Sequence, residues 1–193
     1  MKIAIVDYGA GNIQSIKFAF NRLGFTPELT SDMAEIREAD KVIFPGVGEA
    51  SSAMRKLEQS GLDKVIPKLT QPVLGICLGM QLMCRHTEEG NTRGLGLFNV
   101  DVKKFNQGVK VPQIGWNQIR ELKSGLFQDI PENGYIYLVH SYYAPLREET
   151  IAVSDYGLAY SSALQRDNFY GVQFHPEKSS SVGAKILRNF IDM

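Results

Sequence analysis

The sequence has 193 residues, which is enough for one domain with a substantial core, and its 21 basic and 21 acidic residues cancel. This balance argues against a nucleic-acid or acidic-membrane surface, and no stretch is long enough to span a membrane. The N-terminal apolar run Ile3–Val6 is too short for a signal peptide, and Cys77 and Cys84 are too far apart on one helix to form a disulfide. We therefore expect a single domain over residues 1–193, located in the reducing cytoplasm.

Two strand–loop–helix units open the chain. Ile3–Val6 predicts the first strand, and Asn12 is a candidate N-cap for a helix with apolar residues at helical spacing. The second strand, residues 41–44, runs into the loop Pro45-Gly46-Val47-Gly48 and a helix that Ser51 or Ser52 could cap. The sequence leaves two interpretations of this loop open: an ordinary turn, or a segment that offers backbone N–H groups to a ligand.

A strand-to-helix corner carries a candidate nucleophile. Residues 72–74 end a buried strand, and Cys77 follows between Gly75 and Gly79, where a helix begins. This spacing is typical of a nucleophile elbow with sulfur in place of the serine oxygen. The start of the helix favours the thiolate, and the N–H of Leu78 is placed to bind an oxyanion. The alternative is a small buried cysteine beside a turn.

The second half of the chain has more β character. Residues 87–96 predict a surface loop, and from residue 98 successive β runs indicate an antiparallel extension of the sheet. His140-Ser141-Tyr142 follows a strand at residues 135–139 and is in a position to line a cleft. A strand at residues 170–174 and a C-terminal helix from about residue 181 to residue 191 complete the chain. We predict an α/β fold with a mostly parallel central sheet flanked by helices.

Three histidines are candidates for the base that a cysteine nucleophile needs. His86 is expected on the surface, at the polar end of the elbow helix, and His140 has no neighbouring carboxylate in the sequence. His175 ends the last strand, and Glu177 lies two residues further on, so its carboxylate can reach the imidazole and fix its tautomer. Taken alone, this His-Pro-Glu run is also compatible with a loop that carries a surface carboxylate.

Two motifs together resemble a known family. Residues 75–81 (Gly-Ile-Cys-Leu-Gly-Met-Gln) and 171–177 (Gly-Val-Gln-Phe-His-Pro-Glu) are similar to the signatures of the triad, or class I, glutamine amidotransferases. Residues 6–12, 45–48 and 112–117 further resemble one subfamily, the glutaminase subunits of imidazole glycerol phosphate synthases. The resemblance covers essentially the whole chain.

The resemblance implies an activity and a set of site residues. Cys77 would attack the side-chain carboxamide of glutamine, His175 would move the proton, and Glu177 would orient His175. The oxyanion hole would use the N–H groups of Val47 and Leu78. The substrate's amino-acid end would be held by Gly48, Gln81 and the backbone of His140, Ser141 and Tyr142. No cofactor or metal is expected.

The resemblance also implies a partner. In this family the ammonia passes to a separate cyclase subunit, which is a (β/α)₈ barrel and makes imidazole glycerol phosphate and aminoimidazole carboxamide ribotide in histidine biosynthesis. This chain is too short to contain such a barrel, which needs about 250 residues. The residues that resemble the subunit interface are Asn12, Trp116, Tyr137 and Lys178. A core position is the alternative for Trp116.

Other functions remain possible at this point. The glutaminase of pyridoxal phosphate synthase would share the triad, but the match at residues 112–117 argues against it. A cysteine peptidase or γ-glutamyl hydrolase is the enzymatic alternative, and a catalytically silent regulatory subunit is the non-enzymatic one. The intact Cys-His-Glu set disfavours the last of these.

Overall fold

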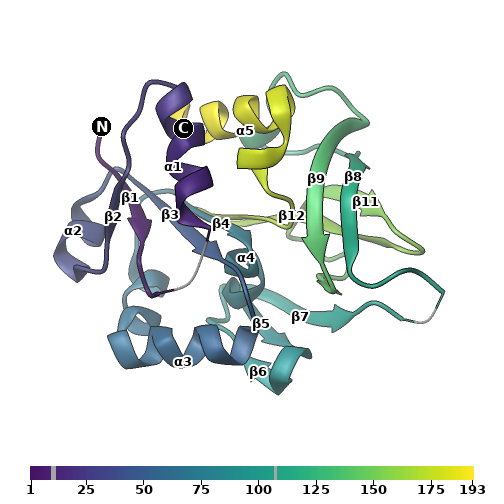
Figure 1. Cartoon of the computed structure of the whole chain (residues 1–193), viewed down its shortest axis with the longest axis horizontal. Helices are drawn as coiled ribbons and strands as arrows, with labels where there is room; N and C mark the ends of the chain where they lie inside the picture. The colour runs from purple at the N-terminus through teal and green to yellow at the C-terminus, as the bar shows by residue number, and fades with distance from the viewer. Residues whose placement is uncertain (10–11, 107) are drawn as a thin grey trace.

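In the computed structural model, which describes residues 1–9, 12–106 and 108–193, the chain folds around a seven-stranded sheet (Figure 1). Strands β13, β4, β3, β1 and β2 run parallel, and β12 and β11 extend one edge in antiparallel fashion. The strands are, in spatial order, β11 (Thr150–Asp155), β12 (Ala159–Arg166), β13 (Phe169–Val172), β4 (Val73–Cys77), β3 (Lys41–Gly46), β1 (Ile3–Val6) and β2 (Glu28–Thr30). The predicted α/β class with a mostly parallel sheet is confirmed.

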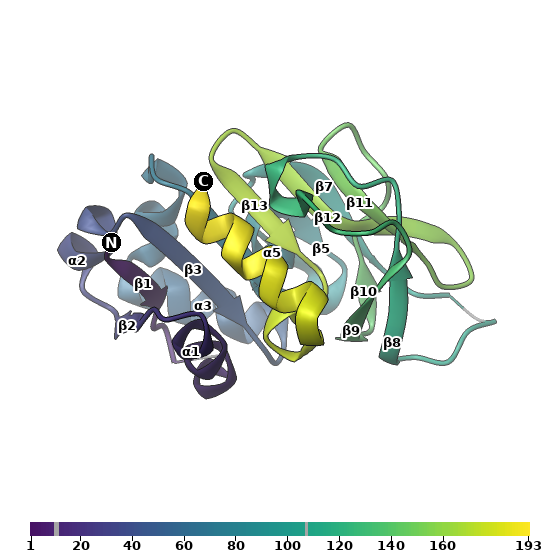
Figure 2. The same ribbon diagram turned by 90° about the horizontal axis from the view of Figure 1, so that it is seen from above.

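Helices cover both faces of this sheet. Successive side chains of a strand point to opposite faces, so Ile3 and Ile5 pack with α1 and α5, whereas Ala4 and Val6 pack with α2 and α3. Figure 2 shows α5 lying along the sheet. Both faces of β1 and β3 are therefore apolar, as is typical of parallel strands. The helices on these two faces are α1 (Ile13–Arg22), α2 (Met33–Glu38), α3 (Ala50–Ser60) and α5 (Ser180–Asp192).

The predicted antiparallel extension of the sheet is confirmed for β11 and β12, whereas the β runs between residues 98 and 143 do not join the central sheet. The other β runs form two smaller sheets. Strands β8 and β9 bury only one face, through residues such as Ile119, Ile136 and Leu138, so they pack over the core as a separate pair. The smaller sheets contain β8 (Gln113–Ile119) with β9 (Gly134–His140), and β10 (Tyr142–Tyr143) with β7 (Phe98–Lys104), β5 (Cys84–Thr87) and β6 (Thr92–Arg93).

The elbow helix is shorter than predicted. Helix α4 (Leu78–Met83) ends where Cys84 enters β5, because β5 pairs with both β6 and β7. His86 is therefore half-buried in a strand, where its Nε2 lies 3.0 Å from Asn91 Oδ1, and the predicted surface loop at residues 87–96 contains β6. Cys77 and Cys84 are both free thiols.

Two predicted helix caps differ from the structure. Glu49, not Ser51 or Ser52, caps α3, since its carboxylate accepts hydrogen bonds from both serine N–H groups. Asn12 precedes α1 but makes no side-chain capping hydrogen bond within the part of the chain that the structure describes, and Ala10 and Gly11 of the motif at residues 6–12 lie outside it. None of the helices in this part combines the length and apolarity needed to cross a lipid bilayer.

Candidate active site

Cys77 occupies the corner between β4 and α4. It is the last residue of the strand, and the helix begins at Leu78. Its backbone has φ 54° and ψ −112°, a conformation that a residue with a side chain rarely adopts. Strained backbone of this kind clusters at active sites, where the surrounding structure holds it in place. The elbow predicted from the sequence is therefore present in the backbone itself.

The glycines on either side of Cys77 are needed for close packing. A Cβ atom at Gly79 would overlap the carbonyl oxygen of Phe44 on the neighbouring strand. A Cβ atom at Gly75 would lie 2.5 Å from Met83 Sδ. Neither glycine has a positive φ, so the turn itself is made by Cys77, and the glycines allow α4 to lie directly against β3 and β4.

His175 and Glu177 form a buried pair beside this corner. His175 Nδ1 lies 2.8 Å from Glu177 Oε1, and both side chains are almost completely buried. The backbone between them is held by hydrogen bonds from His175 N–H to Tyr137 O and from Ser179 Oγ to His175 O. Burial lowers the pKa of His175, but hydrogen bonds and charge from Cys77 and Glu177 outweigh it and raise this pKa above its ordinary value. The arrangement therefore favours the protonated, imidazolium form of His175.

A cavity of about 430 Å³ opens above Cys77. It brings together residues that are far apart in the sequence, from the loop at residues 45–48, the elbow, the end of β9 and the start of the C-terminal loop. Among the residues singled out from the sequence, the cavity is lined by Asn12, Val47, Gly48, Cys77, Leu78, Gln81, His140, Ser141, Tyr142, His175 and Lys178. Glu177 lies outside the lining, behind His175, as an orienting group would.

One backbone carbonyl organises the polar floor of the cavity. Tyr142 O accepts hydrogen bonds from His140 Nδ1 at 2.7 Å and from Gln81 Nε2 at 3.1 Å. Gln81 Nε2 also donates to Gln173 Oε1 at 2.8 Å. Burial, with the positive charge of His175, lowers the pKa of His140 to about 4, so this histidine is neutral and acts through its hydrogen bonds.

Comparison with known proteins identifies the family. The family model described as class-I glutamine amidotransferase matches residues 4–193. The chain belongs to the class-I glutamine amidotransferase family.

Bacterial relatives of this amidotransferase are similar over their whole length. The chain is 53% identical over 196 residues to the imidazole glycerol phosphate synthase subunit HisH of Bacteroides fragilis, with 100% of both chains covered. It is 47% identical to the protein of the same name from Haemophilus influenzae, with 100% of this chain and 98% of the relative covered. Both relatives are named as subunits, which implies that each works with a partner subunit.

Solved structures of more distant proteins share the fold. A protein from Thermoplasma acidophilum, described as part of a putative GMP synthase, has a TM-score of 0.77 at 23% identity, with 100% of this chain and 92% of that chain covered. The structure of PurLQS from Thermotoga maritima has a TM-score of 0.74 at 16% identity, with 99% of this chain and 97% of that chain covered. At these identities the likeness establishes the architecture of the amidotransferase and nothing finer.

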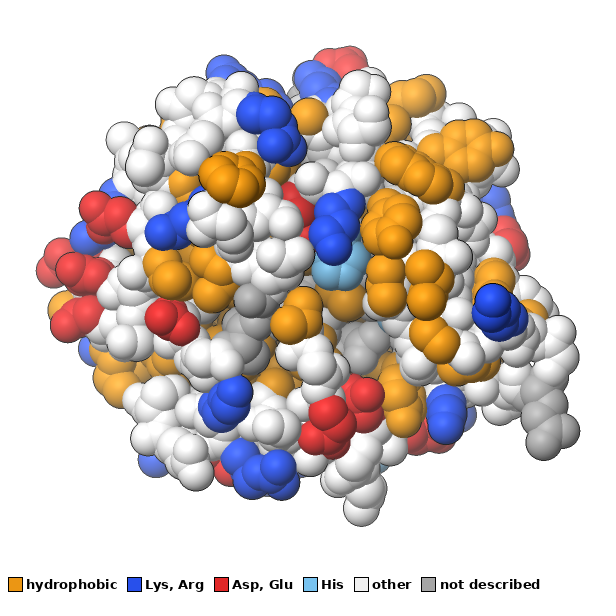
Figure 3. All heavy atoms as spheres, in the orientation of Figure 1, with side chains coloured by type: hydrophobic (Ala, Val, Ile, Leu, Met, Phe, Trp, Pro, Cys, Tyr) orange, Lys and Arg blue, Asp and Glu red, His pale blue; other side chains and the backbone are white. Residues whose placement is uncertain are grey.

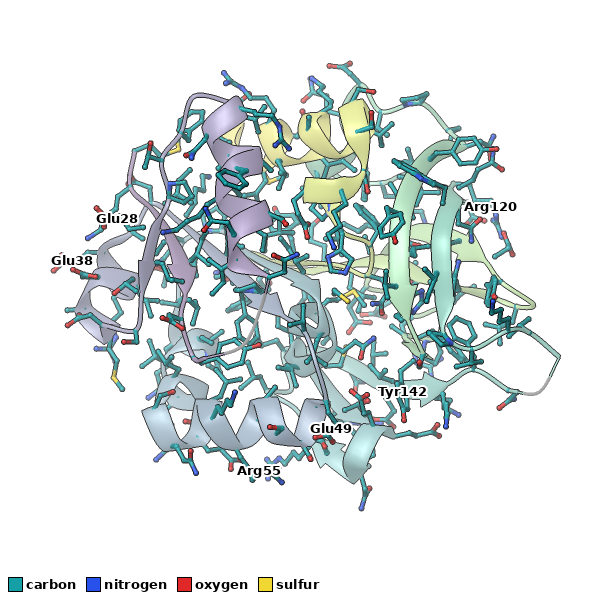
Figure 4. All side chains as sticks on the ribbon, viewed as in Figure 1. Glu28, Glu38, Glu49, Arg55, Arg120 and Tyr142 are labelled. Atoms are coloured by element: carbon teal, nitrogen blue, oxygen red, sulfur yellow. The ribbon has the colours of Figure 1, made fainter. Side chains whose placement is uncertain are left out.

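The motifs of the amidotransferase did not reveal Glu89. This carboxylate lines the cavity and accepts a hydrogen bond from Ala50 N at 3.0 Å. Burial and the nearby Glu49 raise the pKa of Glu89, whereas the Ala50 hydrogen bond lowers it. Figure 4 shows Glu49 at the start of α3 and Tyr142 across from it. Burial and the charges of Glu89, Glu88 and Glu49 raise the pKa of Tyr142, so this rim of the cavity is acidic. The only signal in the sequence was an acidic pair in a polar stretch, which is common on protein surfaces.

The residues expected at a partner interface lie on one exposed face of the amidotransferase. Trp116 is 53% exposed and packs edge-on against Tyr137, with ring centroids 5.9 Å apart, so the alternative of a core tryptophan is wrong. Asn12 and Lys178 are exposed at the mouth of the cavity. In Figure 3 hydrophobic side chains gather over β8 and β9, beside a histidine and a basic side chain. This face therefore combines an apolar patch with the entrance to the site.

The described residues of the amidotransferase offer no clear place for a metal ion. No group of three or more His, Cys, Asp or Glu side chains with suitable spacing occurs within residues 1–9, 12–106 and 108–193. His86, the remaining histidine, lies outside the cavity lining.

Proposed function

We propose that this chain is the glutaminase subunit of an imidazole glycerol phosphate synthase, acting in histidine biosynthesis. The observation that carries the catalytic part is the strained Cys77 beside the buried His175–Glu177 pair, at the floor of a cavity. The full-length similarity to bacterial HisH subunits supports the assignment to this synthase.

In the proposed reaction, the thiol proton of Cys77 passes to His175, and Cys77 Sγ then attacks the carboxamide carbon of glutamine as a thiolate. The oxyanion that forms is stabilised by the N–H groups of Leu78 and Val47. His175 then protonates the leaving nitrogen, so that ammonia departs and a γ-glutamyl thioester remains. Water activated by His175 hydrolyses this thioester to glutamate, while Glu177 keeps the imidazole in the required orientation.

Glutamine recognition can be assigned from the polar groups of the cavity. Both hydrogens of the Gln81 amide nitrogen are used within the protein, so its oxygen is the atom left to accept from the substrate's α-ammonium group. Glu89 supplies a carboxylate for the same group. Gly48 and the backbone of Ser141 and Tyr142 then hold the remainder of the amino-acid end.

The proposed partner is a cyclase subunit with a (β/α)₈ barrel, and it docks on the face that carries Trp116, Tyr137, Asn12 and Lys178. Large aromatic side chains on an exposed surface are typical centres of protein interfaces. Docking there covers the mouth of the cavity, so ammonia reaches the partner before water protonates it to ammonium. The cyclase then produces imidazole glycerol phosphate and aminoimidazole carboxamide ribotide.

Replacement of Cys77 by Ser, tested in the complex with the cyclase, separates this function from its alternatives. Glutamine-dependent synthesis should be lost, and synthesis driven by added ammonium salts should remain, because the cyclase chemistry lies on the partner. Cys84→Ser is the matched control, since Cys84 is fully buried outside the cavity and should leave both activities in place. Loss of both activities in an assembled Cys77→Ser complex would contradict the proposal. A chain that releases no glutamate with any cyclase would instead be a silent regulatory protein.

A further inference from the structure

We propose that Gln173 is a further catalytic residue, whose side-chain amide donates a hydrogen bond to Cys77 Sγ and stabilises the thiolate. Gln173 Nε2 lies 3.8 Å from this sulfur, within the range of an N–H···S hydrogen bond. The significance of the thiolate rests on the proposed glutaminase function, but the contact itself does not.

The orientation of the Gln173 amide follows from a chain of hydrogen bonds. Tyr142 O can only accept, so the Gln81 amide must present its nitrogen to it. The same nitrogen then donates to Gln173, which must present its oxygen to Gln81. The Gln173 amide nitrogen is consequently the group that faces Cys77. A reversed Gln173 amide would put two N–H donors face to face.

The position of Gln173 is fixed by the central sheet. Strand β13 pairs with β4 through Val172 and Ile76. Gln173 follows directly after the last residue of β13, and Cys77 is the last residue of β4. Gln173 is fully buried, and its backbone N–H donates to Ser162 O at 2.8 Å. A buried polar side chain needs partners at both ends, and here these are Gln81 and Cys77.

The Gln173 N–H favours the thiolate form of Cys77 over the thiol form. A hydrogen bond to a charged acceptor is roughly twice as strong as one between neutral groups, so the N–H stabilises the thiolate more than the thiol. Gln173 also connects Cys77 to Gln81, which lines the cavity on the substrate side. The Gln173 side chain therefore links the nucleophile directly to a residue of the substrate site.

The test is the pH dependence of Cys77 alkylation by iodoacetamide, followed by peptide mass spectrometry. Gln173→Met removes both polar contacts with little change of volume, and we expect the midpoint of the profile to rise by about one pH unit and the rate at neutral pH to fall about tenfold. Gln165→Met is the matched control. Gln165 is half-buried on β12, its amide contacts Tyr170 Oη instead of Cys77, and the profile should be unchanged.

Gln173→Glu provides a second variant in case the Met variant does not fold. Its side chain keeps the shape and the acceptor for Gln81 but replaces the donor with a carboxylate oxygen, so the midpoint should rise further. A midpoint equal to that of the unmodified protein in either folded variant would overturn the proposal. Because alkylation needs neither glutamine nor a partner, a shifted midpoint in a chain without glutaminase activity would contradict the proposed function alone.

Discussion

His175 Nδ1 donates a 2.8 Å hydrogen bond to Glu177 Oε1, while Glu177 Oε2 is buried and has no hydrogen-bond partner among the described residues. The negative charge of the buried Glu177 carboxylate is therefore balanced mainly by the imidazole of His175. Because Nδ1 is engaged with Glu177, Nε2 is the nitrogen left to exchange a proton with Cys77. This relationship predicts unequal consequences for the loss of each partner.

Glu177→Gln should reduce glutaminase turnover less than His175→Ala does. The amide oxygen can still accept from Nδ1, so the tautomer is kept and only the charge that stabilises the imidazolium is lost. In a comparable hydrolase triad, removal of the orienting carboxylate reduces turnover roughly a hundredfold less than removal of the base does. We expect a similar difference here. Glutamate release by the complex with the cyclase measures both variants. Equal losses would show that Glu177 does more than orient and stabilise His175.

His140 should make the stability of the protein depend on pH. Its pKa is lowered to about 4, so in mild acid the unfolded chain binds a proton that the folded chain does not. The stability that the neutral His140 contributes is thus fully present above the ordinary histidine pKa, and it is lost as pH falls toward about 4. The loss between about pH 7 and about pH 5 should be about 2 kcal/mol from this group.

Urea unfolding of His140→Asn, whose amide can still donate to Tyr142 O, tests this expectation. The variant should lose less stability on acidification than the unmodified chain. His86→Asn, which removes a histidine outside the cavity, is the control. The same loss of stability on acidification in His140→Asn and the unmodified chain would assign the acid sensitivity to other groups.

Local motifs predicted the strand-to-helix corner at Cys77 and the pairing of His175 with Glu177, because the residues of each feature lie within one short segment. Cys77 is flanked by Gly75 and Gly79 within one turn, and His175 and Glu177 share one loop, so their spacing is visible in the sequence. Gln173 and Gln81 meet across 92 residues, and Glu89 reaches the cavity through the folding of β5 and β6. Such tertiary contacts leave no local pattern, so Gln173 and Glu89 were not predicted, and Gln81 was placed near the substrate only through the family resemblance.

The errors in predicting the fold have the same origin. The apolar run that begins α4 favours a longer helix, but pairing of β5 with β7 outweighs the local propensity and ends the helix at Met83. The alternation along β8 correctly indicated a strand but could not say which sheet it joins. It does account for Trp116, which lies with Ile114 on the exposed face of that strand.

Gly79→Ala should be strongly destabilising. The added Cβ would overlap the carbonyl oxygen of Phe44, and the nearest atoms are all backbone of the central strand β3, which leaves little room to shift. We expect a loss of about 3 kcal/mol in the free energy of unfolding, measured with urea. Gly125→Ala is the control, because its Cβ would meet only Met193 Cε, at 3.9 Å. A Gly79→Ala chain as stable as the Gly125→Ala chain would mean that α4 can move away from β3.

Trp116→Ala should weaken binding to the cyclase without destabilising the isolated chain. The side chain is 53% exposed, so it contributes little to the core, but exposed tryptophans are frequent centres of interfaces. We expect a loss of about 2 kcal/mol in the binding free energy, measured by titration calorimetry. Leu29→Ala is the control, since Leu29 is 37% exposed on β2 at the opposite edge of the molecule (Figure 1). Unchanged affinity in Trp116→Ala would mean that the cyclase does not bind at β8 and β9.

The loop at residues 45–48 should act as a switch for the glutaminase. Tyr8 Oη donates a 2.8 Å hydrogen bond to Pro45 O, which holds the first peptide of the loop in place. Beyond it, Val47 is 39% exposed, and Gly48 has φ 95° with no atom near where a Cβ would lie. Gly46 ends β3 and packs closely against Gly79 of α4, so a rotation has to begin at the Gly46–Val47 peptide, where the chain leaves the strand. We expect this peptide to rotate there and to bring its N–H into or out of the oxyanion hole.

Removing one oxyanion donor typically reduces turnover by about 10²–10³, so this rotation is large enough in effect to control activity. We expect the isolated chain to bind glutamine but hydrolyse it slowly, and the cyclase carrying its ligand to raise kcat by that factor with a smaller change in KM. Steady-state glutamate release by the chain alone, with cyclase, and with cyclase plus ligand measures this, and calorimetry with Cys77→Ala measures glutamine binding separately. If the isolated chain turns over as fast as the liganded complex, the Gly46–Val47 peptide already points into the oxyanion hole at rest and the loop is only a fixed part of the site.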